Sequence, residues 1–221
     1  MSQDARGGYR FDGLPIDPVT PGTNLLVAGP PFAGTRDVAL RMAAAGEAAG
    51  EGLILVSTDD PAATLIDDYA DVGGTFDRRR MAVIECIEPS EGPEDENVRT
   101  VRSPGDLTGI GIEFSSLYEG LYAEGIERVR IGLFSVTTLL MYADELQPVY
   151  RFLHTITGRV RSAEGLGVAV VDPTAQDEQT VSSVAQTFDG RVDVRRTDDE
   201  YQLRVRGLSD QPEGWQRFGT D

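Results

Sequence analysis

The chain has 221 residues, of which 37 are acidic and 20 are basic, and its formal net charge at pH 7 is -17. Cys86 is the single cysteine, which excludes a disulfide framework and a cysteine-rich metal site. No apolar run approaches the roughly 20 residues of a membrane-spanning helix, so we expect no membrane as a partner.

The length suits one α/β domain with a full core, and we expect a single domain over residues 1–221. Residues 1–24 are polar and rich in glycine and proline, which predicts a lead-in segment along the edge of the domain. Residues 88–106 begin with an acidic stretch broken by proline and glycine, which predicts a surface loop.

The chain is organised around residues 25–37, where an apolar strand runs into a glycine-bounded turn and then a helix. A phosphate-binding loop has glycine, four residues, glycine, lysine, and then serine or threonine. Gly29 and Gly34 fit this spacing, but Thr35 occupies the lysine position and Arg36 the hydroxyl position. Because the lysine neutralises phosphate and the hydroxyl ligates magnesium, the sequence retains the scaffold of such a loop without its two chemical side chains.

A helix over 37–49 is followed by a continuous apolar run at 52–58, which predicts a strand covered on both faces. Asp59 and Asp60 follow this strand, at the end where open α/β sheets keep their chemistry. Asp60 before Pro61 also has the pattern of an N-cap followed by proline at the first helical position. A helix cap and a catalytic pair of carboxylates are the two interpretations.

A third strand is predicted at 81–87, and the three arginines at 78–80 form the one local basic cluster. They are either a solvated strand entry or a binding patch. Nucleic acid is not an expected partner, because no reading helix and no basic, aromatic stripe are recognisable.

Three glycines lie among polar and β-branched residues at 103–114. This stretch is either a backbone that approaches a ligand or partner, or a tight turn before the helix that contains Phe114. A fourth strand is predicted at 129–135, with 135–140 as the turn that leaves it. Phe134 stands where a nucleotidase of the phosphate-loop class has the acidic residue for magnesium.

The rest of the chain predicts a helix at 148–162, which carries the only histidine, and a fifth buried strand at 167–172. Near the end of the chain the spacing of the apolar residues changes. Apolar and polar residues alternate within 192–207 on both sides of a turn at 197–200, a pattern typical of a hairpin. The predicted fold class is α/β, with a mainly parallel sheet flanked by helices and a C-terminal antiparallel hairpin. No metal site is expected, because acidic clusters arise freely in so acidic a chain.

The loop at 29–36, the acidic pair after the second strand and the closing hairpin resemble the RecA superfamily, and specifically its KaiC-like ATPases. The resemblance covers nearly the whole chain and implies a RecA-like P-loop fold. Residues 103–114, 139–144 and 177–180 resemble a haloarchaeal group described only as KaiC-like.

The resemblance also implies positions for the family's functional residues. The phosphate lysine falls on Thr35, the magnesium hydroxyl on Arg36 and the magnesium aspartate on Phe134. The catalytic glutamate pair falls on Asp59 and Asp60. Both Walker motifs are therefore degenerate.

Family members reach the nucleotide of a neighbouring subunit with a Lys-x-Arg-Gly motif on the last hairpin. The matching residues are Arg204, Val205, Arg206 and Gly207. The resemblance thus implies an interface at Arg204 and Arg206, through self-association or a protein partner.

These observations favour a catalytically inactive domain, a pseudo-ATPase, that acts as a regulatory or signalling protein-interaction module and needs no cofactor. One alternative is a non-hydrolysing sensor that binds ATP or another phosphate ligand at Gly29, Gly34, Thr35 and Arg36. Another is an enzyme of altered chemistry that uses Asp59 and Asp60.

All 20 basic residues are arginines, and no lysine occurs. An acidic, lysine-free surface stays solvated where salt is concentrated and screening lengths fall to a few Å. This composition is typical of extremely halophilic archaea, with an ordinary acidic cytosolic protein as the alternative. The N-terminus lacks a signal-peptide profile, so we expect a cytoplasmic protein.

Overall fold

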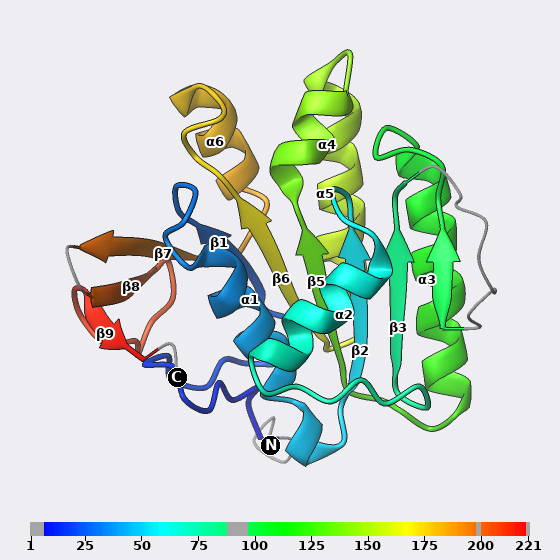
Figure 1. Ribbon diagram of the computed structural model, residues 1–221, viewed down its shortest axis with the longest axis horizontal. Coiled ribbons are helices and arrows are strands. Elements are labelled where there is room, and N and C mark those ends of the chain that lie inside the picture. Colours follow the sequence, from blue (N-terminus) through cyan, green and yellow to red (C-terminus); the bar gives the residue numbers. More distant parts are fainter. Residues whose placement is uncertain (1–6, 88–96, 198–199, 220–221) are drawn as a thin grey trace.

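The computed structural model describes residues 7–87, 97–197 and 200–219. In these residues a single sheet of nine strands is covered by helices on both faces (Figure 1). The strand order is β4-β3-β2-β5-β6-β1-β7-β8-β9. The strands from β4 to β7 in this order run parallel, and β8 and β9 are added antiparallel.

The strands are β1 (Asn24–Ala28), β2 (Gly52–Ser57), β3 (Met81–Glu85), β4 (Val98–Thr100), β5 (Val129–Phe134), β6 (Leu166–Val171), β7 (Gly190–Thr197), β8 (Glu200–Arg206) and β9 (Gln216–Phe218). The α-helices are α1 (Thr35–Ala44), α2 (Ala62–Asp71), α3 (Leu107–Ala123), α4 (Val136–Tyr142), α5 (Leu146–Ser162) and α6 (Glu178–Ala185). A short 3-10 helix, Glu47–Ala49, follows α1. Within the described residues, no helix is both long enough and apolar enough to cross a membrane.

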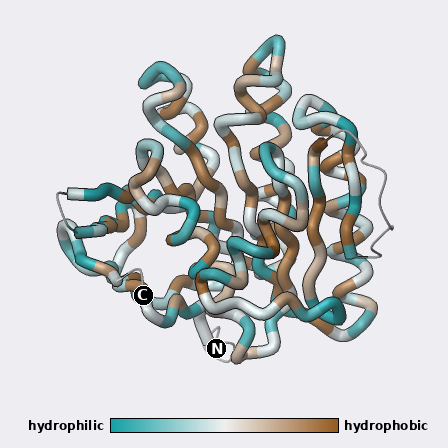
Figure 2. The backbone as a smooth tube through the Cα atoms, in the orientation of Figure 1, coloured by the Kyte–Doolittle hydropathy of each residue, from teal (hydrophilic) through white to brown (hydrophobic). Residues whose placement is uncertain are grey.

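The central strands are apolar along their length because both faces of the sheet are covered (Figure 2). Successive side chains of a strand point to opposite faces. In β1, Leu25 and Val27 join the core under α1 and α2, whereas Leu26 and Ala28 join the core under α3, α4 and α5. The two apolar cores, one on each face of the sheet, therefore fix the positions of the strands and of the loops that follow them.

The predicted fold class is confirmed: the sheet is mainly parallel, helices flank it, and the C-terminal hairpin is β7–β8. The predicted number of five parallel strands was too low. Within the expected surface loop 88–106, residues 88–96 lie outside the described residues, and Val98–Thr100 forms the edge strand β4. Three half-buried or exposed residues give too weak a pattern to be recognised from sequence.

The stretch 103–114 contains a turn, closed by a hydrogen bond of 3.0 Å from the Asp106 amide to the Ser103 carbonyl oxygen, and then the start of α3, which carries Phe114. The interpretation as a tight turn before the helix is therefore confirmed for Gly105, whereas Gly109 and Gly111 lie within the helix. The Asp106 carboxylate caps this helix by accepting a hydrogen bond of 2.8 Å from the Gly109 amide, and Gly111 lies in the second helical turn. The structure differs from the prediction after β5, where α4 replaces the predicted turn at 135–140. The Ser135 hydroxyl caps α4 by accepting from the Thr138 amide.

The described part of the lead-in segment is anchored by a buried ion pair. Arg130 of β5 is 2% exposed, and its Nε lies 2.6 Å from Oε2 of Glu51. Its Nη2 donates to the backbone carbonyl of Arg10, and its guanidinium lies 5.3 Å from the centre of the Tyr9 ring. This pair fixes the lead-in against the amino ends of the strands, away from the loop after β1.

Candidate functional site

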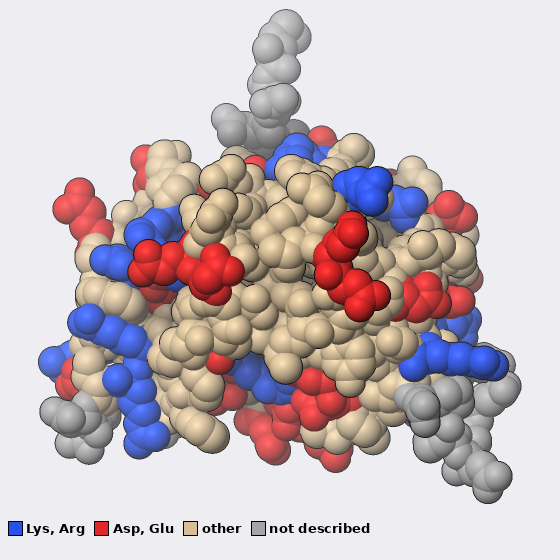
Figure 3. All heavy atoms as spheres, turned by 90° about the horizontal axis from the view of Figure 1, so that it is seen from above, with Lys and Arg blue, Asp and Glu red and all other residues tan. Residues whose placement is uncertain are grey.

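The candidate site lies at the carboxyl ends of the parallel strands, on the face shown in Figure 3, where β1 turns into α1. A Cβ on Gly29 would lie 2.4 Å from the Thr35 hydroxyl oxygen and 2.7 Å from the Val194 carbonyl oxygen. Gly34 has φ of 83°, a conformation that favours glycine. Both glycines of the predicted loop are therefore required by its geometry.

Thr35, in the lysine position of the loop, is the first residue of α1. Its side chain turns inward: the residue is 8% exposed, and Oγ1 has no hydrogen-bond partner among the described residues. The amides of the first turn have no acceptor within a helix, so they also face the loop. The scaffold thus keeps hydrogen-bonding groups in place but lacks an ammonium group.

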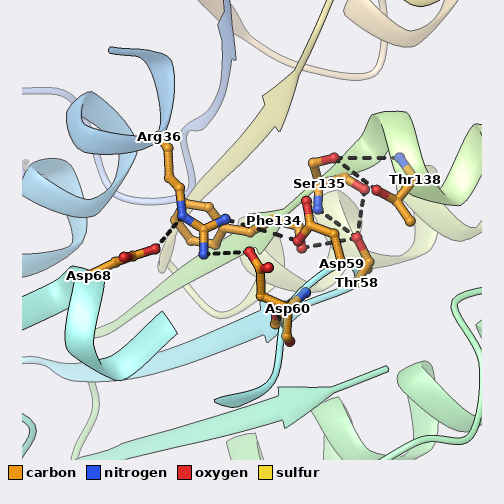
Figure 4. A network of polar contacts seen from close by, with 9 residues as sticks. Arg36, Thr58, Asp59, Asp60, Asp68, Phe134, Ser135 and Thr138 are labelled. Carbon is orange, nitrogen blue, oxygen red and sulfur yellow. Dashed lines mark hydrogen bonds and ion pairs between the residues drawn. The ribbon is translucent and has the colours of Figure 1, made fainter. Parts of the chain in front are cut away.

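Arg36, in the hydroxyl position, extends away from the loop toward three carboxylates (Figure 4). Its Nε lies 2.7 Å from Oδ2 of Asp68 in α2, and its Nη2 lies 3.0 Å from Oδ2 of Asp60. Asp59 Oδ1 is 4.0 Å from Nη1. The guanidinium carbon lies 5.5 Å from the centre of the Phe134 ring.

This arrangement reverses the charge of the site. Three carboxylates around one guanidinium give this cluster a formal charge of -2, and the lysine that a phosphate-binding loop carries is absent. The Arg36 side chain is 28% exposed, so the ion pairs are partly screened but not fully solvated. The arginine neutralises its neighbouring carboxylates instead of a ligand.

Asp59 has a perturbed carboxyl group. Burial raises the pKa of Asp59 above its ordinary value of 3.8, and repulsion by Asp60 adds to this shift, while Arg36 opposes it. A raised pKa combined with a cavity is a feature of functional sites, and of structural ion-pair networks as well.

Phe134 ends β5 at the place of the family's magnesium aspartate, and it is 1% exposed. Its carbonyl oxygen accepts from the Thr58 hydroxyl at 2.9 Å, and the Ser135 amide donates to Thr58 Oγ1 at 2.6 Å (Figure 4). These bonds hold the ends of β2 and β5 together. The ring contributes no oxygen ligand to the site.

A cavity of about 400 Å³ lies between the loop and the ends of β5 and β6. Its lining combines an apolar loop with hydroxyl groups and charged residues: Gly29, Pro30, Pro31, Phe32, Gly34, Thr35, Arg36, Asp37, Asp59, Phe134, Ser135, Thr137, Thr138, Val170, Val171 and Asp172. The resemblance of the sequence to KaiC-like ATPases implies magnesium-ATP at this place. The residues do not fit that group, because neither a lysine for phosphate nor a carboxylate at Phe134 for magnesium is present.

A family model matches residues 22–194, and its description is "Family of unknown function (DUF7504)". The chain belongs to this family. The matched region contains the loop, the acidic cluster and the end of β5. No curated protein matches the chain.

Among solved structures, the chain is similar to the KaiC-like protein PH0186 from the hyperthermophilic archaeon Pyrococcus horikoshii OT3. The TM-score is 0.67 at 14% sequence identity, over 95% of this chain and 92% of that chain. This likeness shows that the DUF7504 chain shares the fold of that KaiC-like protein.

The hairpin arginines lie outside the cavity of the DUF7504 chain. Arg204 Nη2 lies 3.1 Å and Arg206 Nε lies 2.7 Å from Oδ2 of Asp193, and Arg191 also pairs with this carboxylate. The guanidinium of Arg204 lies 4.7 Å from the centre of the Trp215 ring. The interface predicted at Arg204 and Arg206 therefore has to form from side chains that already have partners within the chain.

The prediction that Asp60 caps a helix was wrong. The N-cap of α2 is Pro61, which has no side-chain cap, and Asp60 turns toward Arg36 instead. Glu85 at the end of β3 satisfies the free amide of Ala62, at 2.8 Å from its Oε2. Neighbouring parallel strands bring Glu85 to α2, a contact between residues distant in sequence.

Sequence reasoning missed Asp68 as part of the site. The feature of the sequence that could have identified Asp68 is its position in the second turn of α2, on the side of the helix that faces α1. The only histidine, His154, is exposed on α5 and does not line the cavity. The described residues contain no group of three histidine, cysteine, aspartate or glutamate side chains that could hold a metal ion.

Proposed function

We propose that this KaiC-like domain does not hydrolyse nucleotides and acts as a regulatory or signalling module that binds another protein or a second copy of itself. The observation that carries the proposal is the ion-pair cluster of Arg36 with Asp59, Asp60 and Asp68. It turns the Arg36 guanidinium away from the loop, while the cavity beside the loop keeps the carboxylates of Asp37, Asp59 and Asp172. These carboxylates would repel the terminal phosphates of ATP in a partly buried site.

Two substitutions add to this argument. The lysine position holds Thr35, and the chain contains no lysine that could replace it from elsewhere. The magnesium position holds the buried ring of Phe134. Nucleotide binding, metal binding and transition-state stabilisation thus each lack the residue on which they depend.

The composition supports a halophilic archaeon as the source and a cytoplasmic location, and both remain part of the proposal. At concentrated salt the screening length is about 3 Å, so a surface of charge -17 is tolerated. Experiments on the chain therefore belong in potassium chloride of about 2 M.

The proposal is tested by thermal unfolding of the full chain with ATP, ADP and GTP, each with magnesium, at about 2 M potassium chloride. We expect no increase in the unfolding temperature with any of the three nucleotides. A nucleotide that stabilises the chain, with an effect that saturates at micromolar concentration, would contradict it. An ATP hydrolysis assay of the same sample is expected to give no more phosphate than buffer alone.

A phosphate or nucleotide sensor without hydrolysis is the second candidate. It is favoured by the cavity at the N-terminus of α1, because free amides and the positive end of a helix dipole attract anions. Arg36 weighs against it, because its charge is already matched by carboxylates. Stabilisation by inorganic phosphate or ADP without turnover would favour the sensor over the interaction module.

A further inference from the structure

The charge of the cavity beside the loop is the starting point. Its charged lining residues are Arg36, Asp37, Asp59 and Asp172. Three carboxylates against one guanidinium give a formal charge of -2. Arg36 is itself paired with Asp60 and Asp68, which do not line the cavity. The cavity therefore attracts a positively charged group.

The cavity also offers oxygen acceptors. Thr35 is more than nine-tenths buried, lines the cavity, and its hydroxyl has no hydrogen-bond partner among the described residues. Asp172 uses Oδ1 to accept from the amide and hydroxyl of Thr174, at 2.8 and 2.7 Å, so its Oδ2 remains available to a donor. Carboxylate and hydroxyl oxygens are the partners that guanidinium and ammonium groups require.

An apolar projection stands next to this acidic cavity. Phe32 is 92% exposed, and Pro30 and Pro31 before it are exposed too. Phe32 also has φ of 64°, a conformation that is strained for a large side chain. An aromatic ring that is solvent-exposed in the free chain gains apolar contact area when a partner covers it.

We propose that the cavity binds a basic side chain of a partner protein, an arginine or a lysine, and that Phe32 packs against an apolar residue beside it. This inference rests on the proposed function, because a nucleotide in the cavity would exclude the side chain. Asp59 and Asp172 supply the charge, and Thr35 supplies a hydroxyl acceptor. The degenerate loop has then exchanged an anionic ligand for a cationic one.

The test uses the full chain and two probes that differ only in charge, N-acetyl-arginine amide and its neutral isostere N-acetyl-citrulline amide. Both are titrated into isotopically labelled protein, at the lowest potassium chloride concentration at which circular dichroism shows the chain folded. We expect the arginine probe to shift the backbone amide resonances of Gly34, Thr35 and Asp172, and the citrulline probe to leave them unchanged. Equal shifts with both probes would overturn the proposal.

Asp172→Asn keeps the oxygen that accepts from Thr174 and removes the charge. It is expected to weaken binding of the arginine probe about fivefold. Asp210→Asn removes the same charge at an exposed residue outside the cavity and is expected to leave the affinity unchanged. The proposal fails if both variants bind the probe as the wild type does.

The apolar contact is tested with N-acetyl-leucyl-arginine amide. We expect this probe to bind more tightly than the arginine probe, and Phe32→Ala to abolish the difference. Equal affinity of the two probes for the wild type would remove Phe32 from the site.

The outcomes separate this inference from the proposed function. If magnesium-ATP binds with micromolar affinity, the proposed function fails and the inference fails with it. If neither ATP nor the arginine probe binds, only the inference fails.

Discussion

The side chains of Arg36 and Asp68 join α1 to α2 through a contact of 2.7 Å between Nε and Oδ2. The same guanidinium reaches Asp60 at 3.0 Å, so one arginine links the loop after β1, the loop after β2 and a helix. Arg36, at the hydroxyl position of the loop motif, therefore holds the site together.

Replacement of Arg36 tests this structural role. Arg36→Ala leaves three carboxylates close together without a cation, and we expect it to lower the free energy of unfolding by about 1–2 kcal/mol at low salt. The loss should shrink at about 1 M potassium chloride, where the screening length is about 3 Å. Thermal unfolding at several salt concentrations measures it, with Asp210→Asn as the control. A loss that does not depend on salt would contradict the electrostatic explanation.

For the buried ion pair of Glu51 and Arg130 we predict a larger loss in the free energy of unfolding. Both side chains are at most 3% exposed, so Glu51→Gln leaves the Arg130 guanidinium buried without a counter-charge. We expect a loss of about 3–5 kcal/mol in chemical denaturation. Arg128→Ala is the matched control: this arginine pairs with the same glutamate, but its side chain is 29% exposed, and about 1 kcal/mol is expected. Similar losses for the two variants would contradict the account.

From the raised pKa of Asp59 we predict that the stability of the folded chain depends on pH. Because its pKa is raised in the folded chain, the folded state takes up a proton at higher pH than the unfolded state. The resulting stabilisation is complete below the ordinary value of 3.8 and is lost as the pH rises through the raised pKa. Asp59→Asn should remove this part of the pH dependence. Unfolding temperatures of the wild type and variant across acidic pH test it, and identical slopes would contradict the prediction.

Rebuilding the loop tests whether its side chains limit binding. The double variant Thr35→Lys, Arg36→Ser restores the phosphate lysine and the magnesium hydroxyl on a scaffold whose glycines are in place. We expect it to gain measurable affinity for magnesium-ATP over the wild type in equilibrium dialysis. No gain would mean that the shape of the loop, with Phe32 exposed, also prevents binding.

The fold could be predicted well from the sequence because the spacing of apolar residues and the turn residues are local signals. The apolar runs of β1, β2, β3, β5 and β6 were recognised, as were the two glycines that the loop geometry requires. The edge strand β4 and the short helix α4 were missed, because three or seven residues carry little periodic signal.

The site was predicted only in part, because its central contacts join residues far apart in the chain. The sequence placed Arg36 in the loop, but its contact with Asp68 comes from the packing of α2 against α1. The same packing turns Asp60 away from its expected role as a helix cap. Local propensity does not report such tertiary contacts.

The most direct test of the account is an isothermal titration of magnesium-ATP into the wild-type chain, at about 2 M potassium chloride, alongside the double variant Thr35→Lys, Arg36→Ser. We predict no heat of binding for the wild type at nucleotide concentrations up to about 1 mM. A dissociation constant in the micromolar range for the wild type would show that the Arg36 cluster does not exclude phosphate, and the account would be wrong.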